Sequence, residues 1–309
     1  MNYRHAYHAG NFADVLKHAV LARVLDYLKR KAAPFRVIDT HAGAGRYALT
    51  APEAGKTGEW QAGIARLIGP DTKPLAPGVA DLLRPYLDAV RAENAGADAA
   101  SGLVVYPGSP CIALRLMRAQ DVLVANELHP EDLAHLKAAI GRDPRAKPMT
   151  LDGWVALKAL LPPKERRGVV LIDPPFEAAG ELERMTLGLA QALQRFATGI
   201  YIAWYPIKDP KPIKRFHAEL ARLGRPDLLR VELLIQRTDQ ADRLSGCGLV
   251  VANPPFTLER ELAVMLPELR RRLAVAGDGG SYRLDWITKG GAATAGAQPG
   301  AKRRMRSRP

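Results

Sequence analysis

The chain has 309 residues, a formal net charge of +13 and a pI of about 9.9. No apolar run is long enough to cross a bilayer and residues 1–12 lack the apolar core of a signal peptide, so the sequence favours a cytoplasmic protein. Cys111 and Cys247 lie far apart and form no CxxC pair, which argues against a disulfide framework or a zinc knuckle. The basic charge predicts a polyanionic partner, most commonly nucleic acid.

Residues 11–31 predict a helix, because apolar residues recur there at helical spacing. The segment NYRHAYHAGNFADVLKH interleaves aromatic, cationic and histidine side chains ahead of this helix and in its first turns. Such a mixture suits base stacking and phosphate contact, whereas the histidine spacing matches no standard zinc pattern, so we expect no metal. The simpler alternative is an ordinary N-terminal helix that covers a sheet.

A glycine-containing turn follows a short predicted strand at residues 35–38, in the segment DTHAGAGR. The turn lacks the third glycine of a dinucleotide fingerprint and the GK[ST] of a phosphate-binding loop. Taken alone, it therefore favours a structural turn. Residues 47–100 then interrupt the pattern with Pro, Gly and amphipathic pieces, and they predict a helical insertion.

Strands and helices alternate regularly from residue 103 onwards. This alternation predicts a mostly parallel sheet covered on both faces, and the closely spaced last strands predict an antiparallel edge. Residues 289–309 are rich in Gly, Ala and Arg and predict a disordered tail. Six of the excess positive charges lie in this tail: Lys289, Lys302, Arg303, Arg304, Arg306 and Arg308.

Polar groups stand at the ends of four successive predicted strands, where an open α/β sheet binds its ligand. The first is the glycine turn, and the next is Glu127, which suits two ribose hydroxyls. Asp152 could accept a hydrogen bond from an adenine amino group, and Asp173 opens the segment DPPF. The order of these features indicates an S-adenosylmethionine-dependent methyltransferase with an α/β fold.

The DPPF segment suits the transfer of a methyl group to an adenine amino nitrogen. Asp173 and the carbonyl of Pro174 can each accept one N–H, and Asp173 can take the proton. Phe176 can stack on the base once it leaves the helix, and catalysis would rest on orientation and electrostatics. A second copy, NPPF, begins at Asn253. We interpret it as a strand-end turn on the substrate side with little claim to catalysis.

Motifs along residues 1–288 together resemble the bacterial 23S ribosomal RNA adenine-N6 methyltransferases of the RlmJ type. They are YRHAYHAGNFADVLKH, DTHAGAGRY, TGEW…GI, YPGSP, NELHP, DG, RRGVVLIDPPFE, RFATGIYIAWYP and NPPF. The resemblance implies a Rossmann-like fold with a small helical insertion at 47–100 and an N-terminal helical motif at 1–34. It further implies a monomer that methylates one adenine of 23S rRNA.

The resemblance also assigns site residues. Those expected to contact S-adenosylmethionine are His18, His41, Ser109, Glu127, Asp152, Gly153 and Asp173. Asp173 is also the expected catalytic acceptor, Tyr3 would touch the RNA, and Lys17 is a neighbouring candidate. Phe176 stands where the family often has Tyr, which keeps the stacking face and loses a hydroxyl. The basic tail lies outside the family pattern, so its RNA-binding role rests on charge alone.

Three alternative functions stay open at this point. An N6-adenine DNA methyltransferase would use the same pocket, although the chain leaves little room for a target-recognition domain. A non-catalytic RNA-binding or assembly factor on a methyltransferase scaffold would tolerate the loss of Asp173. A protein-glutamine methyltransferase would instead depend on Asn253.

Overall fold

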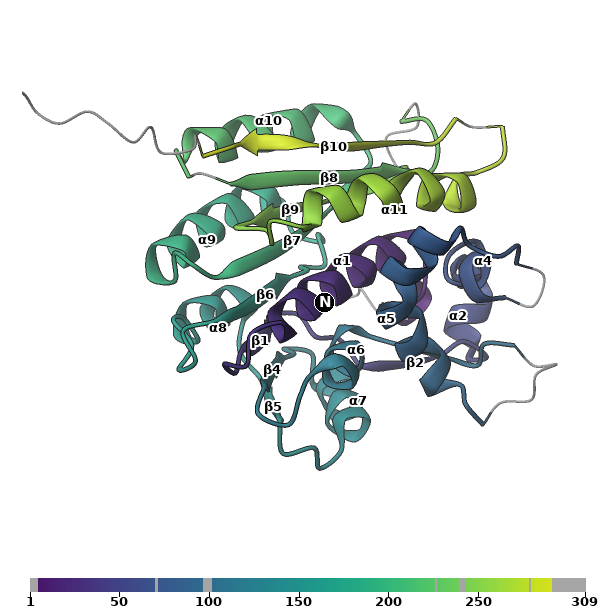
Figure 1. Ribbon diagram of the computed structural model, residues 1–309, viewed down its shortest axis with the longest axis horizontal. Helices are drawn as coiled ribbons and strands as arrows, with labels where there is room; N and C mark the ends of the chain where they lie inside the picture. Colours follow the sequence, from purple (N-terminus) through teal and green to yellow (C-terminus); the bar gives the residue numbers. More distant parts are fainter. Residues whose placement is uncertain are drawn as a thin grey trace, which may run out of the picture.

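The computed structural model describes residues 5–69, 72–96, 102–225, 227–238, 243–277 and 279–290. Its centre is an eight-stranded sheet in the order β10-β8-β9-β7-β6-β1-β4-β5, shown in Figure 1. In chain order these strands are β1 (Arg36–Asp39), β4 (Val122–Asn126), β5 (Ala146–Met149), β6 (Gly168–Ile172), β7 (Ile200–Ile207), β8 (Leu228–Leu234), β9 (Gly246–Ala252) and β10 (Ser281–Thr288).

The direction of the strands agrees with the predicted sheet. Strands β5, β4, β1, β6 and β7 pair in parallel, whereas β9 is antiparallel to both of its neighbours and β10 is antiparallel to β8. Strand β1 lies between β4 and β6, so the chain builds the sheet outwards in both directions from β1. The carboxyl ends of β1, β4 and β6 therefore meet at a topological switch point, where such sheets bind ligands.

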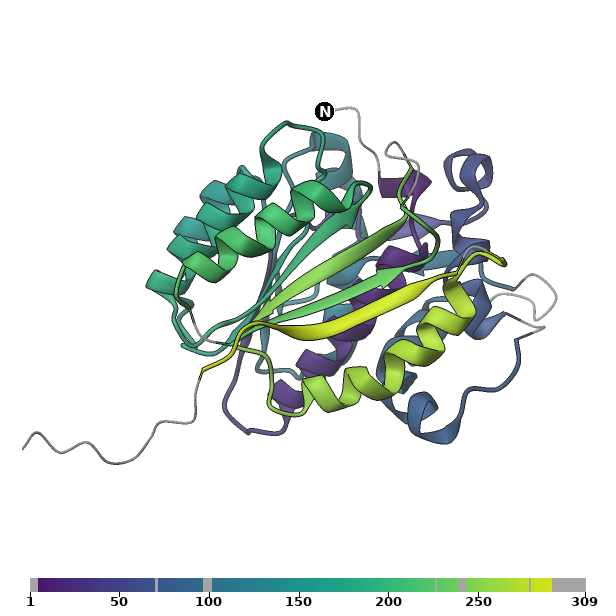
Figure 2. The same ribbon diagram turned by 90° about the horizontal axis from the view of Figure 1, so that it is seen from above.

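Helices cover both faces of the sheet (Figure 2). One face carries α1 (Phe12–Lys29), α5 (Pro77–Glu93), α6 (Ser109–Leu116), α7 (Pro130–Ile140) and α11 (Leu258–Leu273). The other carries α8 (Gly153–Ala159), α9 (Glu181–Arg195) and α10 (Pro210–Arg222). Each face buries its own hydrophobic cluster, as a two-sided α/β sheet requires. Within the described residues, no helix combines the length and apolar character needed to span a membrane.

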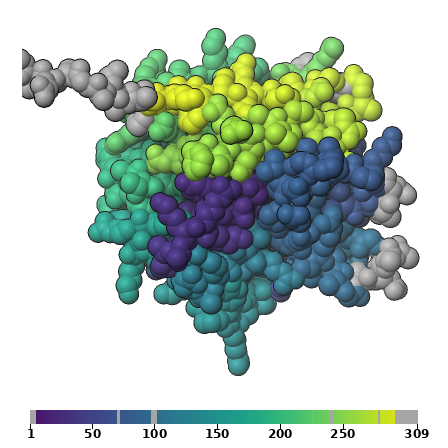
Figure 3. All heavy atoms as spheres, viewed as in Figure 1, coloured from purple at the N-terminus to yellow at the C-terminus, as the bar shows by residue number. Residues whose placement is uncertain are grey.

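Helix α1 is a core helix. Its N-cap is Asn11, whose side chain accepts hydrogen bonds from the backbone N–H groups of Ala13 and Asp14. All residues from Phe12 to Leu25 are buried, because the sheet, α5, α6 and α11 surround the helix. In Figure 3 the N-terminal segment (purple) is visible only between the helices that enclose it. The covering role predicted for residues 11–31 is therefore confirmed.

The described residues between 46 and 107 include helices that pack beside α1. They form β2 (Arg46–Ala48), α2 (Pro52–Thr57), α3 (Glu59–Ala62), α4 (Ala65–Ile68), α5 and β3 (Val105–Pro107), and β2 pairs with β3 in an antiparallel ribbon. The predicted helices are present, while the three-residue strand β2 was missed because so short a segment has no periodicity. The division into domain, insertion and tail stays a prediction, and residues 291–309 of the tail lie outside the described residues.

Candidate functional site

A cavity of about 340 Å³ opens at the carboxyl edge of the sheet. Its volume suits a small-molecule ligand, which typically occupies about 300–1,000 Å³. Helix α1 and the turns after β1, β4, β5 and β6 line it. The lining includes all the residues expected to contact the cofactor, namely His18, His41, Ser109, Glu127, Asp152, Gly153 and Asp173, together with Lys17 and Pro174.

Glu127 shapes the glycine turn from the end of β4. Its Oε2 accepts a hydrogen bond from the N–H of Gly43 (2.8 Å), and its Oε1 accepts one from the N–H of His129 (2.7 Å). Gly43 has φ +62° and a Cβ there would lie 2.2 Å from the Tyr47 hydroxyl, so this position requires glycine. Burial raises the pKa of Glu127. The fixed carboxylate lines the cavity, and each of its oxygens can accept a further hydrogen bond, which fits a vicinal diol.

Asp152 and Gly153 begin α8. Asp152 is the N-cap, and its Oδ1 accepts hydrogen bonds from the backbone N–H groups of Trp154 (3.0 Å) and Val155 (3.1 Å). Its Oδ2 receives no hydrogen bond from any described residue, so it is available to an amino group in the cavity. Gly153 leaves room for the His41 ring, because a Cβ at this position would lie 2.2 Å from His41 Nε2.

Gly153→Ala is expected to weaken cofactor binding by tenfold or more, because the His41 ring would have to leave its place in the cavity lining. The matched control is Gly55→Ala in α2, where an added Cβ meets nothing within 4 Å. Isothermal titration with S-adenosylhomocysteine checks both variants. If Gly153→Ala and the control bound S-adenosylhomocysteine with equal affinity, the close contact between Gly153 and the His41 ring would not contribute to ligand binding.

Ser109 joins the site to the end of β1. Its Oγ donates a hydrogen bond to Asp39 Oδ2 at 2.6 Å, and it is the first residue of α6, whose N-cap is Gly108. Burial raises the pKa of Asp39 to about 6, even though the Ser109 bond opposes that rise. Because its single proton is used on Asp39, the Ser109 oxygen can only accept from a ligand. It therefore suits a donor such as an ammonium group.

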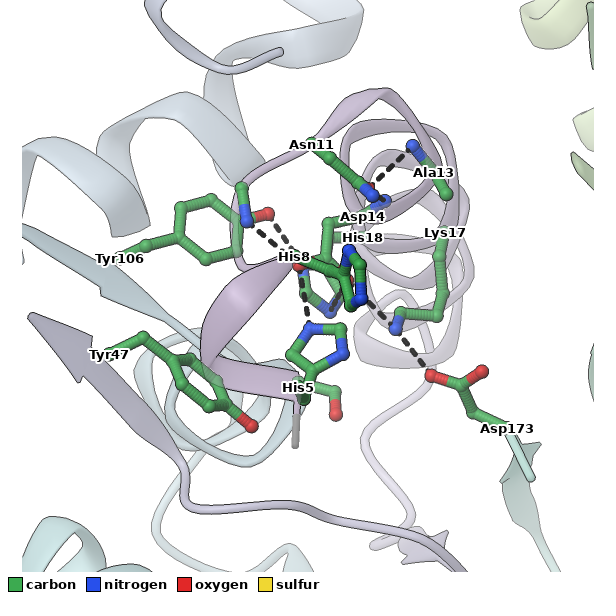
Figure 4. A network of polar contacts seen from close by, with 12 residues as sticks. His5, His8, Asn11, Ala13, Asp14, Lys17, His18, Tyr47, Tyr106 and Asp173 are labelled. Atoms are coloured by element: carbon green, nitrogen blue, oxygen red, sulfur yellow. Dashed lines mark hydrogen bonds and ion pairs between the residues drawn. The ribbon is translucent and has the colours of Figure 1, made fainter. Parts of the chain in front are cut away.

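Asp173, which follows β6, forms an ion pair with Lys17 of α1 (Figure 4). Lys17 Nζ also lies 2.9 Å from Asp14 Oδ1, while Asp14 Oδ2 accepts hydrogen bonds from His5 Nε2 (2.9 Å) and the Gly10 N–H (2.9 Å). The sequence analysis missed Asp14. The sequence did contain a signal for it, because Asp14 precedes Lys17 by three residues in a mostly apolar helix, and side chains at this spacing can form an ion pair.

The two carboxylates set the charge state of Lys17. Burial alone would lower the pKa of Lys17, but Asp14 and Asp173 raise it well above its usual value. Burial likewise favours a raised pKa for Asp14, and the charges of His5 and Lys17 instead hold it well below its usual value. Lys17 is only 4% exposed. It can therefore reach a substrate through the cavity, and not a phosphate on the outer surface.

The other predicted RNA contacts that the structure describes are Pro174 and Phe176. Pro174 lines the cavity, but Phe176 does not, and its ring packs edge-on against Trp204 with centroids 5.7 Å apart. Phe176 adopts φ +53°, a strained conformation for a bulky residue that occurs preferentially at functional sites. Its stacking role stays a prediction. Tyr3 lies outside the described residues.

The second motif, NPPF, is at the opposite edge of the sheet, so the prediction that it lines the substrate side is wrong. Strand β9 runs antiparallel to β7, and Ala252 pairs with Tyr201 near the amino end of β7. The Asn253 side-chain nitrogen donates to the carbonyls of Ala197 (2.8 Å) and Gly199 (2.7 Å). Asparagine is required here because a carboxylate has no hydrogen to donate to two carbonyls.

The cavity fits S-adenosylmethionine. The carboxylates of Glu127 and Asp152 line the positions suited to ribose and adenine, and the Nε2 of His18 is a buried polar atom without a partner among the described residues. The described ranges hold no group of three metal-ligating side chains, and the absence of a metal stays a prediction. The parallel sheet, its switch point and this set of side chains define an S-adenosylmethionine-dependent methyltransferase of the Rossmann-like class.

Comparison with known proteins identifies the family within that class. Residues 32–288 match the model of the family "Ribosomal RNA large subunit methyltransferase D, RlmJ", and the chain belongs to this family. The "Ribosomal RNA large subunit methyltransferase J" of Escherichia coli is 41% identical over 93% of this chain and 99% of its own, and that of Haemophilus influenzae is 39% identical over the same shares. A crystal structure from Legionella pneumophila matches with a TM-score of 0.79 at 32% identity, covering 90% of this chain and 98% of that one.

Proposed function

We propose that the protein methylates N6 of a specific adenine in 23S ribosomal RNA, using a base flipped out of its helix. One observation carries the proposal: Asp173 and Pro174 line the same cavity as the groups suited to S-adenosylmethionine. The names of the two relatives support large-subunit RNA as the substrate. A base in a duplex cannot reach a pocket of this kind without leaving the stack.

The chain's own residues would bind and orient the base. Bound S-adenosylmethionine supplies a methyl group on a sulfonium that is open to attack by a nitrogen. The Asp173 carboxylate and the Pro174 carbonyl each accept one N–H of the adenine amino group, which aims the nitrogen lone pair at that methyl. The methyl group would pass from the sulfonium to N6, with the S–C bond broken as the C–N bond forms, and Asp173 would take the proton that N6 loses. Lys17 keeps the carboxylate in place through its ion pair.

The first experiment incubates the enzyme with tritiated S-adenosylmethionine and rRNA from a strain that lacks the protein, followed by nucleoside analysis. We expect label in N6-methyladenosine of 23S rRNA with the wild type and none with Asp173→Ala. Equal labelling of duplex DNA would favour a DNA methyltransferase. If Asp173→Ala kept the full biological effect, a non-catalytic assembly factor would be favoured. If label appeared in protein and its incorporation depended on Asn253, the protein would be a protein methyltransferase and the proposed rRNA activity would be wrong.

The basic tail is proposed to bind RNA phosphates. Lys289 already contacts Trp286 and Glu259, so the informative truncation ends at Gly290 and removes the five cations that follow it. We expect weaker RNA binding and a flatter salt dependence, by up to about 0.7 in log–log slope for each phosphate that the tail no longer neutralises. Filter binding between low and moderate salt measures the slope. An unchanged slope would show that the tail is inert.

We further propose that the enzyme acts as a monomer in the cytoplasm. The resemblance of its motifs to a monomeric family supports the first point, and an rRNA substrate supports the second. Light scattering coupled to size-exclusion chromatography tests the oligomeric state. A dimer mass at micromolar concentration would contradict the proposal.

A further inference from the structure

A buried chain of three side chains ends at the cofactor cavity. The hydroxyl of Tyr86 in α5 lies 2.9 Å from the hydroxyl of Tyr106 in β3, and the Tyr106 hydroxyl lies 2.7 Å from Nδ1 of His18 in α1. Both tyrosines are 0% exposed and His18 is 1% exposed. The chain joins the segment at 47–100 to a histidine that lines the cavity.

The direction of the hydrogen bonds follows from counting donors. Among the described residues the Tyr86 hydroxyl has one partner, so it satisfies its proton only by donating to Tyr106. Tyr106 must then donate its own proton to His18 Nδ1, which becomes an acceptor. The opposite direction would leave a buried tyrosine proton unsatisfied, which carries a large desolvation cost. The neutral imidazole of His18 therefore carries its hydrogen on Nε2.

The surroundings of Nε2 agree with this tautomer. This atom is buried and has no hydrogen-bond partner among the described residues, and Asp14 Oδ1 lies 3.9 Å away. A proton on Nε2 is favourable beside that carboxylate, whereas a lone pair would be repelled. Burial lowers the pKa of His18 to about 3, so the ring is neutral at physiological pH. His18 thus presents an N–H donor to the cavity.

The second histidine of the cavity carries the opposite tautomer. Thr40 Oγ1 donates its only proton to the Leu171 carbonyl at 3.0 Å, so at 2.9 Å from His41 Nδ1 it must accept. His41 therefore has its hydrogen on Nδ1 and presents the Nε2 lone pair. Burial lowers the pKa of His41 to about 4, which keeps this ring neutral as well. The two rings offer a donor and an acceptor to the same ligand.

We propose that Tyr106, oriented by Tyr86, is a positioning residue that holds His18 as the Nε2–H tautomer, so that His18 donates a hydrogen bond to the α-carboxylate of the bound cofactor. The inference rests on the proposed binding of S-adenosylmethionine in this cavity. The carboxylate is the anionic acceptor of that molecule, and Glu127 and Asp152 already suit its ribose and adenine. Tyr106 itself does not line the cavity, so its effect passes through His18.

Nitrogen NMR of protein labelled in its histidine rings tests the tautomers directly. In the wild type we expect His18 to be the Nε2–H form and His41 the Nδ1–H form. Tyr106→Phe should turn His18 into a mixture of tautomers and leave His41 unchanged, and Tyr86→Phe should produce a smaller change. The matched control is Tyr201→Phe, a tyrosine with 0% exposure whose hydroxyl donates to the carbonyls of Ala192 and Phe196 on the other face of the sheet.

Cofactor binding supplies the second measurement. Tyr106→Phe should weaken S-adenosylhomocysteine by about two- to fivefold, because the affinity falls in proportion to the fraction of His18 that keeps its hydrogen on Nε2. A decarboxylated S-adenosylmethionine, which has no α-carboxylate, should lose almost nothing, and Tyr201→Phe should bind both ligands as the wild type does. In steady state the cofactor KM should rise more than kcat falls.

Clear outcomes would overturn the inference. His18 in the Nδ1–H form in the wild type would refute the direction of the chain, and this measurement needs no variant to fold. Equal losses for the two ligands would refute the role of the carboxylate. A protein that has the expected tautomers and binds the cofactor but leaves rRNA unmethylated would refute the proposed function and leave this inference standing.

Discussion

Replacing Asp173 with asparagine is expected to lower the turnover number by about a thousandfold, within the range of 10²–10⁴ usual for a positioned proton acceptor. Cofactor affinity should change by less than about tenfold, since the amide keeps the size of the carboxylate and the other cavity groups remain. The amide retains one acceptor oxygen but cannot take the proton from N6, and its NH₂ cannot pair with Lys17.

Single-turnover methylation of rRNA and isothermal titration of S-adenosylhomocysteine measure the two effects separately. The matched control is the reciprocal change Asn253→Asp in the second motif. This variant should keep its turnover number, while its free energy of unfolding should fall by about 1–3 kcal/mol because two carbonyls lose their donors. Wild-type turnover in Asp173→Asn would remove this residue from the mechanism.

Lys17→Met is expected to lower the free energy of unfolding by about 3–5 kcal/mol, the usual cost of removing one partner from a buried ion pair. Asp14 is 1% exposed and Asp173 has a side chain that is 16% exposed, so neither carboxylate can turn fully to water. Methionine fills a similar volume, so the loss should come from unpaired charge and not from a void.

Urea unfolding at pH 7 measures this loss, and the double variant Asp14→Asn, Lys17→Met should recover part of it. The pH dependence has a defined sign. The pKa of Asp14 is held below its ordinary value, so its stabilisation is present above about pH 4 and fades as the pH falls through the folded value. The pKa of Lys17 is raised, so its contribution is complete at pH 7 and fades only at more alkaline pH than usual. A single variant as stable as the wild type would contradict this account.

The ends of the strands that carry the site could be predicted from the sequence, because these ends are marked locally. Apolar runs stop at Asp39, Glu127 and Asp173, and parallel strands bring their carboxyl ends to one edge without any further information. Glu127, Asp152 and Asp173, which the pattern selected, all line the cavity, whereas Asp39 lies behind Ser109. The type and order of the long helices followed from periodicity in the same way.

The positions of the Asn253, Lys17 and Phe176 side chains could not be predicted, because each depends on an arrangement that the local sequence does not encode. Strand direction decides whether a motif faces the cavity, and β9 is antiparallel. Burial decides whether a cation contacts phosphate, and Lys17 lies in the buried part of α1. A backbone turn decides where a ring points, and Phe176 has a positive φ.

The ion pair between Lys17 and Asp173 also has a consequence for the order of synthesis. These partners are 156 residues apart in the chain, so the lysine leaves the ribosome long before its catalytic partner exists. Asp14, three positions away on the same helix, is the one carboxylate of this network that is made before Lys17. In a nascent chain arrested before β6, Lys17 could pair only with Asp14, while α5 and α6, which pack on the same helix, would already be made. The second carboxylate would join the pair only when the segment after β6 has been synthesised.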